Sequence, residues 1–306
     1  MSVNISEFSA YLVEAKAVSS NTLESYRRDV SQYLAYLDAE NEDDIAERVA
    51  DSDIEDVKGF IDHLRDNGRS TATITRVLAS VRSYYQFLMI NGVIDYNPAK
   101  QVKVERVVKK VPHILSDAEV IKLLNAPNPS DIKGARDKAM LEVLYATGIR
   151  VSELINLNVE DVYCERNTRG QVRCSGDKNS RSIPMHMEAT NALHYYLYNI
   201  RPLLISPESG NALFINLNGS RLSRQGFWKI VKNYSEIANI SGEITPHTLR
   251  HSFAMHLYQN GASLHDLQVM LGHADISSTQ LYANMSQMDR CQDVYDRCHP
   301  LSAKQK

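Results

Sequence analysis

Cysteine is scarce in this sequence of 306 residues. Its four cysteines, Cys164, Cys174, Cys291 and Cys298, form no Cys-x-x-Cys pair. Disulfide-rich secreted domains and structural zinc sites both use more cysteines at closer spacing. The sequence therefore indicates a chain that folds without disulfides or zinc, which fits a reducing cytoplasm.

Long hydrophobic runs are also missing. No uncharged apolar stretch approaches the roughly 18 residues that a membrane-spanning helix needs. The opening residues, MSVNISEFSAYLVEAK, lack the successive basic, apolar and small-residue blocks of a signal peptide. Internal repeats and low-complexity tracts are not found either. We therefore expect a cytoplasmic protein with no membrane partner.

An excess of basic residues, the usual mark of a nucleic-acid partner, is absent from the chain as a whole. There are 34 lysines and arginines against 37 acids, and the net charge is −3. Ten of the acids lie between Asp38 and Asp56, however, where Arg48 is the one base. The remainder is therefore net positive, which suits a polyanion. On charge counts alone, a solvated acidic loop and helix is the commoner explanation.

What the sequence does contain is enough apolar residues for two domains. Hydrophobic residues make up 43% of the chain, and single cores usually stop growing at about 250 to 300 residues. Apolar residues at helical spacing, with serine caps and Asn-Gly stops, predict a compact helical domain near the N-terminus. Its four predicted helices lie within residues 5–16, 19–38, 54–68 and 69–92.

The fourth of these helices carries arginines and threonines along its length. Such side chains are the donors that phosphate contacts use. Arg69, Arg76 and Arg82 are therefore candidate DNA-binding residues. A solvated helix face explains the same residues equally well.

The composition then changes and a second domain begins. Residues 95–115 hold two prolines and five basic residues, which predicts an extended basic linker. Amphipathic helices are predicted over 131–148 and 150–158, a strand-rich stretch over 159–186, and helices again from Glu188. The sequence therefore predicts a mainly α protein with a small antiparallel β-sheet.

Residues 247–286 combine helical packing with many chemically active side chains. Thr245 and Pro246 predict a helix start, which places His247 and Arg250 on one face of its first turn. Helix N-termini favour anions. Taken singly, a histidine near a helix start is most often a surface or capping residue.

Two more helices are predicted in this region. Ser263 opens LHDLQVML, which stops at Gly272, and Ser277 or Ser278 opens a third helix that carries Tyr282. A lone tyrosine at helical spacing is most often a core residue. The turn NGAS between the first two helices also fits a helix-turn-helix DNA-binding motif.

Taken together, these segments resemble the tyrosine recombinase (phage integrase) family, most closely the bacterial Xer site-specific recombinases. ATGIRVSELINLNVEDV, residues 146–162, is similar to the family's box around its first catalytic arginine. Residues 247–282 are similar to the second box, with His-x-x-Arg, Leu-Gly-His and a tyrosine nine residues after that histidine. The tail VYDRCHPLSA is similar to the Xer ending. The resemblance covers nearly the whole chain.

The resemblance implies a metal- and ATP-independent reaction without a cofactor. A tyrosine hydroxyl attacks a DNA phosphodiester, which leaves a 3′-phosphotyrosine and a free 5′-hydroxyl, and a second strand reverses the step. By resemblance Tyr282 is the nucleophile and His247 accepts its proton. Arg150 and Arg250 clamp the phosphate, because guanidinium groups stay charged and suit phosphate oxygens.

Three further residues receive roles from the resemblance. His273 would hydrogen-bond the same phosphate. Glu153 would orient a clamp residue without contacting the phosphate itself. The family protonates the leaving oxygen with a lysine in a β-hairpin turn, commonly within Gly-Lys-Gly. This sequence departs from that pattern. Residues 175–185 read SGDKNSRSIPM, in which the one lysine, Lys178, has no glycine on either side and lies closer to the following Arg181-x-Ile-Pro sequence. Lys178 is the candidate general acid, or else a solvated turn residue.

The resemblance also implies an architecture and partners. Two domains would form a clamp on double-stranded DNA, as a homotetramer or as a heterotetramer with a paralogous recombinase. The apolar residues after Tyr282 would dock on a neighbour, although packing on their own protomer uses the same residues. The implied parts are a SAM-like core-binding domain (1–95), a linker (96–112), the catalytic domain (113–290) and a tail for protomer contact (291–306).

Two rival classes explain part of the pattern. A non-catalytic helix-turn-helix regulator accounts for NGAS and the basic remainder but gives no role to the boxes. A metal-dependent phosphodiesterase would draw on His247, His251, His273 and Asp275, which form no recognised metal-binding pattern. Within the recombinase class, chromosome dimer resolution and mobile-element integration both remain open.

Overall fold

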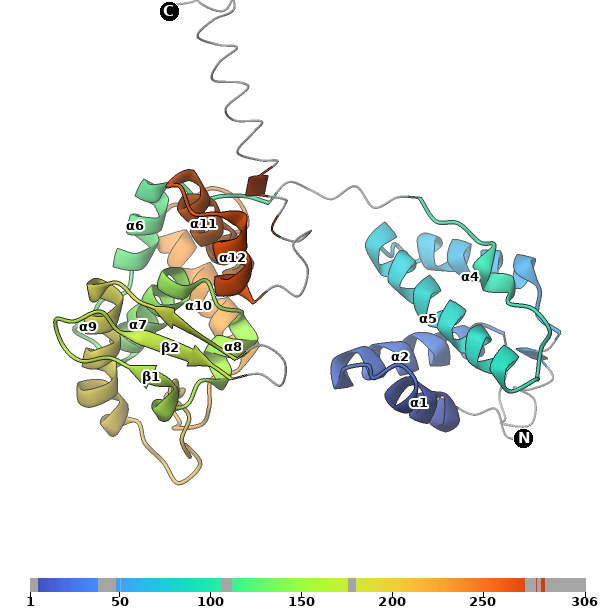
Figure 1. Cartoon of the computed structure of the whole chain (residues 1–306), viewed down its shortest axis with the longest axis horizontal. Helices are drawn as coiled ribbons and strands as arrows, with labels where there is room; N and C mark the ends of the chain where they lie inside the picture. Colours follow the sequence, from blue (N-terminus) through green and yellow to red (C-terminus); the bar gives the residue numbers. More distant parts are fainter. Residues whose placement is uncertain are drawn as a thin grey trace, which may run out of the picture. The chain divides into compact units, whose positions relative to one another are not determined.

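The protein folds into two compact units, Met1–Lys110 and Val111–Lys306. The structure is a computed structural model and describes residues 5–37, 48–49, 51–105, 112–175, 180–272, 279 and 282–283 (Figure 1). Within this part of the chain, no helix is both long and apolar enough to cross a bilayer. The two units are treated one at a time below.

The N-terminal unit is built from helices that pack around α5. Serine or aspartate side chains cap the starts of three of them, at Ser19, Asp53 and Ser70. The core is rich in aromatic rings, among them Tyr84 and Tyr85 of α5. The helices are those that the sequence predicts: α1 (Ile5–Glu14), α2 (Ser20–Tyr36), α4 (Ile54–Asp66) and α5 (Thr71–Ile90).

The segment after α5 belongs to the same unit. A short 3₁₀ helix, η1 (Pro98–Lys100), follows it, and Ala99 and Val102 are buried in the N-terminal core. Arg82 donates from Nε to the carbonyl of Ala99 at 2.9 Å and from Nη2 to the carbonyl of Val102. The first part of the predicted linker therefore packs on the N-terminal unit. The linker bounds 96–112 stay a prediction.

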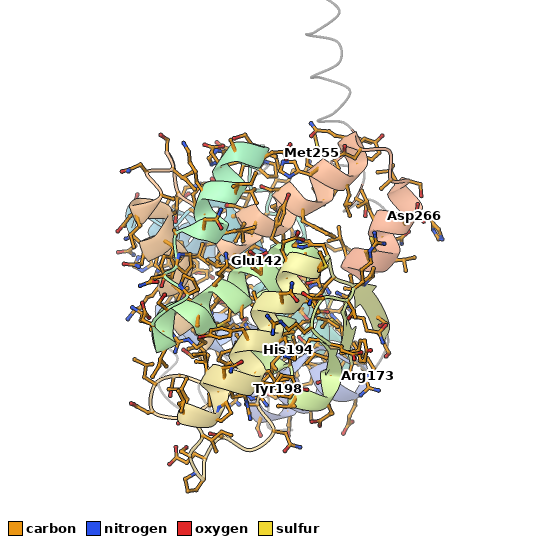
Figure 2. The ribbon with its side chains drawn as sticks, turned by 90° about the vertical axis from the view of Figure 1, so that its left-hand side faces the viewer. Glu142, Arg173, His194, Tyr198, Met255 and Asp266 are labelled. Atoms are coloured by element: carbon orange, nitrogen blue, oxygen red, sulfur yellow. The ribbon has the colours of Figure 1, made fainter. Side chains whose placement is uncertain are left out.

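The C-terminal unit is organised around α7 (Ile132–Thr147), most of whose residues are buried. Helix α9 (Met187–Tyr195) lies along it, and Figure 2 labels Glu142 on α7 and His194 on α9. A π-helical turn, η3 (Tyr196–Ile200), and a 3₁₀ turn, η4 (Arg201–Leu203), continue α9. The other helices are α6 (Asp117–Asn125), α8 (Val151–Asn156), η2 (Val159–Asp161), α10 (Arg224–Ile237), α11 (Pro246–Gln259) and α12 (Leu264–Leu271).

A small antiparallel sheet covers one side of this unit. Its order is β1 (Val162–Tyr163), β2 (Gln171–Cys174) and β3 (Arg181–Pro184). Val172 pairs with Ile183, and both are buried, whereas their strand neighbours alternate outward. The predicted mainly α fold with one small antiparallel sheet is confirmed.

Candidate active site

Gly148 allows two distant segments of the chain to approach each other. It ends α7 with φ 59°, a left-handed conformation that favours glycine. A Cβ atom at this position would lie 2.2 Å from the Phe253 ring of α11. Because no side chain intervenes, α11 packs against the end of α7. Arg150, at the N-cap of α8, and Arg250 of α11 therefore enter the same region.

Three successive carbonyls at the C-terminal end of α12 each accept a hydrogen bond from a different arginine. Figure 2 shows α12, marked by Asp266, next to α11, marked by Met255. Cations are favoured at this end of a helix, where carbonyls lack helical partners. The three bonds are all 2.7 Å long and run from Arg181 to Met270, from Arg250 to Leu271 and from Arg150 to Gly272.

Gly272 closes α12 in a position that favours glycine. Its φ is 62°, and a Cβ atom there would lie 2.7 Å from Nη1 of Arg181. The Leu-Gly-His motif therefore has a physical reason for its glycine. His273, the next residue in the sequence and a predicted site residue, lies outside the described residues.

Glu153 lies between Arg150 and Arg181. Its carboxylate accepts from Arg181 at 2.8 and 3.0 Å, from the backbone N–H of Arg150 at 2.7 Å and from Nη1 of Arg150 at 3.3 Å. Burial alone would raise the pKa of Glu153, but the hydrogen bonds and charges of the two arginines outweigh it and lower that pKa. Glu153 thus contacts Arg150, and its role in orienting a clamp arginine stays a prediction.

The two clamp arginines differ in exposure. Arg250 is 6% exposed and also donates to the carbonyl of Gly148, whereas the Arg150 side chain is 41% exposed. Burial, followed by the charge of Arg150, lowers the pKa of Arg250 to about 10. Arg250 is therefore still a cation at neutral pH.

Tyr282 is buried at 1% exposure, close enough to Arg250 for that charge to act on its phenol. It packs in an apolar cluster with Phe253, Met255, Leu267 and Leu271. Burial raises the pKa of the Tyr282 phenol, and the charge of Arg250 opposes the rise only in part. The phenol is therefore neutral at pH 7 and needs a proton acceptor before it can act as a nucleophile.

The imidazole next to this phenol is His251. Its Nδ1 lies 2.9 Å from the Tyr282 hydroxyl. Burial, together with His247 and Arg250, lowers the pKa of His251, so a neutral ring can accept the phenol proton in a hydrogen bond. His247, predicted from the resemblance, lies one turn earlier on α11 and is exposed. The helical spacing of the two histidines was the one signal for His251 in the sequence.

The remaining predicted site residues are either outside the described residues or in the N-terminal unit. Lys178 falls outside the described residues, as does most of the predicted helix around Tyr282. In the N-terminal unit Arg69 is exposed, Arg76 pairs with the buried carboxylate of Asp29, and Arg82 holds the η1 segment. A DNA-binding role for these three arginines stays a prediction.

No potential metal site formed by three or more histidines, cysteines or carboxylates occurs among the residues that the structure describes. His273 and Asp275, two of the residues that the metal-dependent alternative would use, are outside that part of the chain.

Comparison with known families assigns both parts of the chain. Residues 113–288 match the phage integrase family, and residues 5–92 match its N-terminal SAM-like domain. The tyrosine recombinase XerD of Halalkalibacterium halodurans is 42% identical over 298 residues, which cover 97% of each chain. That of Listeria innocua is 40% identical over 300 residues, covering 97% of this chain and 98% of the other.

Solved structures share the fold at lower identity. XerH site-specific recombinase bound to palindromic difH substrate superimposes with a TM-score of 0.74 at 20% identity, over 96% of this chain and 85% of that one. The Tn1549 transposon integrase in complex with circular intermediate DNA gives 0.69 at 20% identity, over 92% and 95%. The chain belongs to the phage integrase family. Its activity is that of an Xer-like site-specific tyrosine recombinase.

Proposed function

We propose that the protein cuts and rejoins double-stranded DNA through Tyr282. The phenol oxygen forms a bond to phosphorus, the bond from phosphorus to the 5′-oxygen breaks, and a 3′-phosphotyrosine results. A 5′-hydroxyl from another strand then attacks this link and releases the tyrosine. The observation that supports this most is that Arg150 and Arg250 donate to adjacent carbonyls, those of Gly272 and Leu271, beside the buried Tyr282.

The two arginines stabilise the charge that develops on the phosphate. In the transition state, negative charge spreads over the non-bridging oxygens, and fixed cations lower its energy. Arg250 is held by two carbonyls and supplies a cation of fixed position. Arg150 is the more exposed of the pair and reaches the phosphate from the open side.

The proton of the phenol passes to a histidine of α11. His247 is the acceptor by resemblance to the family, and it is exposed on the helix that carries Arg250. His251 holds the phenol at 2.9 Å, and Tyr282 is 1% exposed. Attack on DNA therefore requires Tyr282 to leave its apolar cluster. Its hydroxyl must break the hydrogen bond with His251 and move to the phosphorus of the DNA phosphate.

Two further roles come from the resemblance alone. Lys178 protonates the leaving 5′-oxygen, and His273 hydrogen-bonds a non-bridging oxygen of the phosphate. Both residues lie outside the described part of the chain.

Assembly on DNA follows the same reasoning. A lambda integrase of this fold has been solved as a dimer on a core site and as a tetramer on a Holliday junction. We propose that four protomers act together on DNA in the cytoplasm, at the nucleoid, either as one protein or with a paralogous recombinase. In each protomer, residues 1–95 and 113–290 grip the duplex, residues 96–112 link them, and residues 291–306 contact a neighbour.

A covalent-capture experiment tests this function. The purified protein is incubated in EDTA with fragmented chromosomal DNA of its own host, and adducts that survive SDS are recovered and sequenced. We expect a few discrete sites, retained in EDTA and lost in Tyr282→Phe. Adducts that disappear in EDTA, or that persist undiminished in Tyr282→Phe, would contradict the proposal.

A further inference from the structure

Arg181 of β3 is an arginine at the site that the reaction described above does not use, and little of its side chain is exposed. Its side chain is 8% exposed. Each of its three nitrogens has a partner: Nε donates to the carbonyl of Met270 at 2.7 Å, and Nη1 and Nη2 donate to the two oxygens of Glu153 at 2.8 and 3.0 Å. Burial alone would lower the pKa of Arg181, but Glu153 raises it, so the residue is always charged.

Arg181 touches both partners of the exposed clamp arginine. The side chain of Arg150 bonds to Glu153 at 3.3 Å and to the carbonyl of Gly272 at 2.7 Å. Arg181 holds Glu153, and it also lies against Gly272, where a Cβ atom would meet its Nη1 at 2.7 Å. The position of Arg150 is therefore set by two groups that Arg181 fixes.

The distances also show which arginine holds the carboxylate. The side-chain bonds of Glu153 to Arg181 are shorter than its side-chain bond to Arg150. Without Arg181, the half-buried carboxylate would have Arg150 as its remaining cation and would draw that guanidinium toward itself. A guanidinium that is bound tightly to a carboxylate is less available to a phosphate, because the two anions compete for the same donors.

We propose that Arg181 is a positioning residue of the recombinase, which acts on the DNA phosphate only through Arg150 by fixing Glu153 and the end of α12. The inference rests on the proposed role of Arg150 in clamping the phosphate. A lysine cannot substitute, because one ammonium group does not reproduce three planar donors aimed at a carbonyl and at both oxygens of a carboxylate.

The test compares Arg181→Lys, Glu153→Gln and the double variant on a nicked duplex that carries a site recovered by covalent capture. Single-turnover cleavage, DNA affinity and its salt dependence are measured for each. We expect each single variant to cleave about tenfold to a hundredfold more slowly, as misplaced groups do, with unchanged affinity. The double variant should be no slower than the slower single variant, because the two residues act on one target.

Arg201→Lys is the matched control. Arg201 is also a largely buried arginine, at 8% exposure, and among the described residues it donates to the carbonyls of Gly210 and Ala212, away from the site. We expect this variant to lose thermal stability and to retain its cleavage rate. If Arg181→Lys does not fold, Glu153→Gln provides the test, since it keeps the shape of the side chain and removes its charge.

Several outcomes would overturn the inference. One is wild-type cleavage by Arg181→Lys or by Glu153→Gln. Another is a salt slope reduced by about one, which would indicate a direct phosphate contact of Arg181. Additive losses in the double variant, or an equal loss of cleavage in Arg201→Lys, would also refute it. A failure of the proposed role of Arg150 would give a different result, because Arg150→Ala would then cleave as fast as the wild type.

Discussion

The hydroxyl of Tyr282 lies 2.9 Å from Nδ1 of His251, and this contact joins the proposed nucleophile to the helix that carries Arg250. The phenol is buried, and its pKa is raised, so the proton stays on oxygen and is donated to a neutral imidazole. The proposed nucleophile is thus protonated and buried in this structure.

Removing the His251 imidazole should show how much its hydrogen bond with Tyr282 contributes to the free energy of unfolding. In His251→Phe the buried phenol loses its acceptor, and an unsatisfied buried hydroxyl costs about 1 to 3 kcal/mol. Urea unfolding should show a loss of that size in the wild-type background and a much smaller loss in Tyr282→Phe, which has no hydroxyl to satisfy. Equal losses in the two backgrounds would show that the contact carries no energy.

The lowered pKa of His251 predicts a dependence of stability on pH. His247 and Arg250 are the titratable or charged groups that act on this ring, and Tyr282 is its hydrogen-bond partner. Since the folded pKa is below the unfolded value of 6.5, the unfolded chain binds the proton first. The stabilisation is therefore complete above pH 6.5 and is lost as the pH falls through the folded pKa.

The measurement is the free energy of unfolding of the wild type and of His251→Phe at several pH values from about 5 to about 8, which is about 1.5 units on either side of the unperturbed histidine pKa. The wild type should lose more stability across this range than the variant does. Parallel curves would mean that another group controls the pH dependence.

Gly148 should tolerate alanine poorly. An alanine there meets both a left-handed backbone, at φ 59°, and the Phe253 ring at 2.2 Å. Gly210 is a matched control, because its φ is 48° and nothing lies within 4 Å of a Cβ atom. Gly210→Ala should cost about 1 to 2 kcal/mol of stability from backbone strain alone, and Gly148→Ala clearly more, with slower cleavage. Similar losses of stability would show that α11 does not depend on this close approach.

Alanine substitutions of the two clamp arginines should differ in their effect on stability, although both should slow cleavage. Arg150→Ala removes an exposed guanidinium, so we expect nearly wild-type stability and cleavage about a hundredfold to a thousandfold slower. Arg250→Ala also deprives the buried carbonyls of Gly148 and Leu271 of a donor, so stability should fall as well. Thermal melts and single-turnover cleavage, measured side by side, check both. A stable but inactive Arg250→Ala would contradict the structural half of this prediction.

Much of the fold could be predicted from the sequence, because its signals are local. Ser116 caps α6 within its own first turn, Gly148 ends α7, and Thr245 with Pro246 starts α11. The alternation of Val172 and its neighbours likewise gives a strand with one buried face. Each of these signals acts over a few residues, which a pattern in the chain can record.

The centre of the site could be predicted only in part. The two sequence boxes predict Arg150, Arg250 and Tyr282 as site residues, and the structure places Arg150 and Tyr282 near Arg250, while their catalytic roles stay predictions. Several partners of the two arginines are backbone carbonyls, such as that of Leu271, and a sequence pattern does not show which carbonyl accepts a bond. The role of Arg181 was hidden for the same reason, because its strand position alone does not show what it bonds to.

The identity of the residue that becomes linked to DNA tests the central claim most directly. Covalent adducts formed on host DNA are digested with protease and nuclease, and the nucleotide-bearing peptide is sequenced by mass spectrometry. The account predicts a phosphodiester-linked nucleotide on Tyr282, attached through the 3′-phosphate. A nucleotide linked to any other residue, or a 5′-phosphate link, would contradict it.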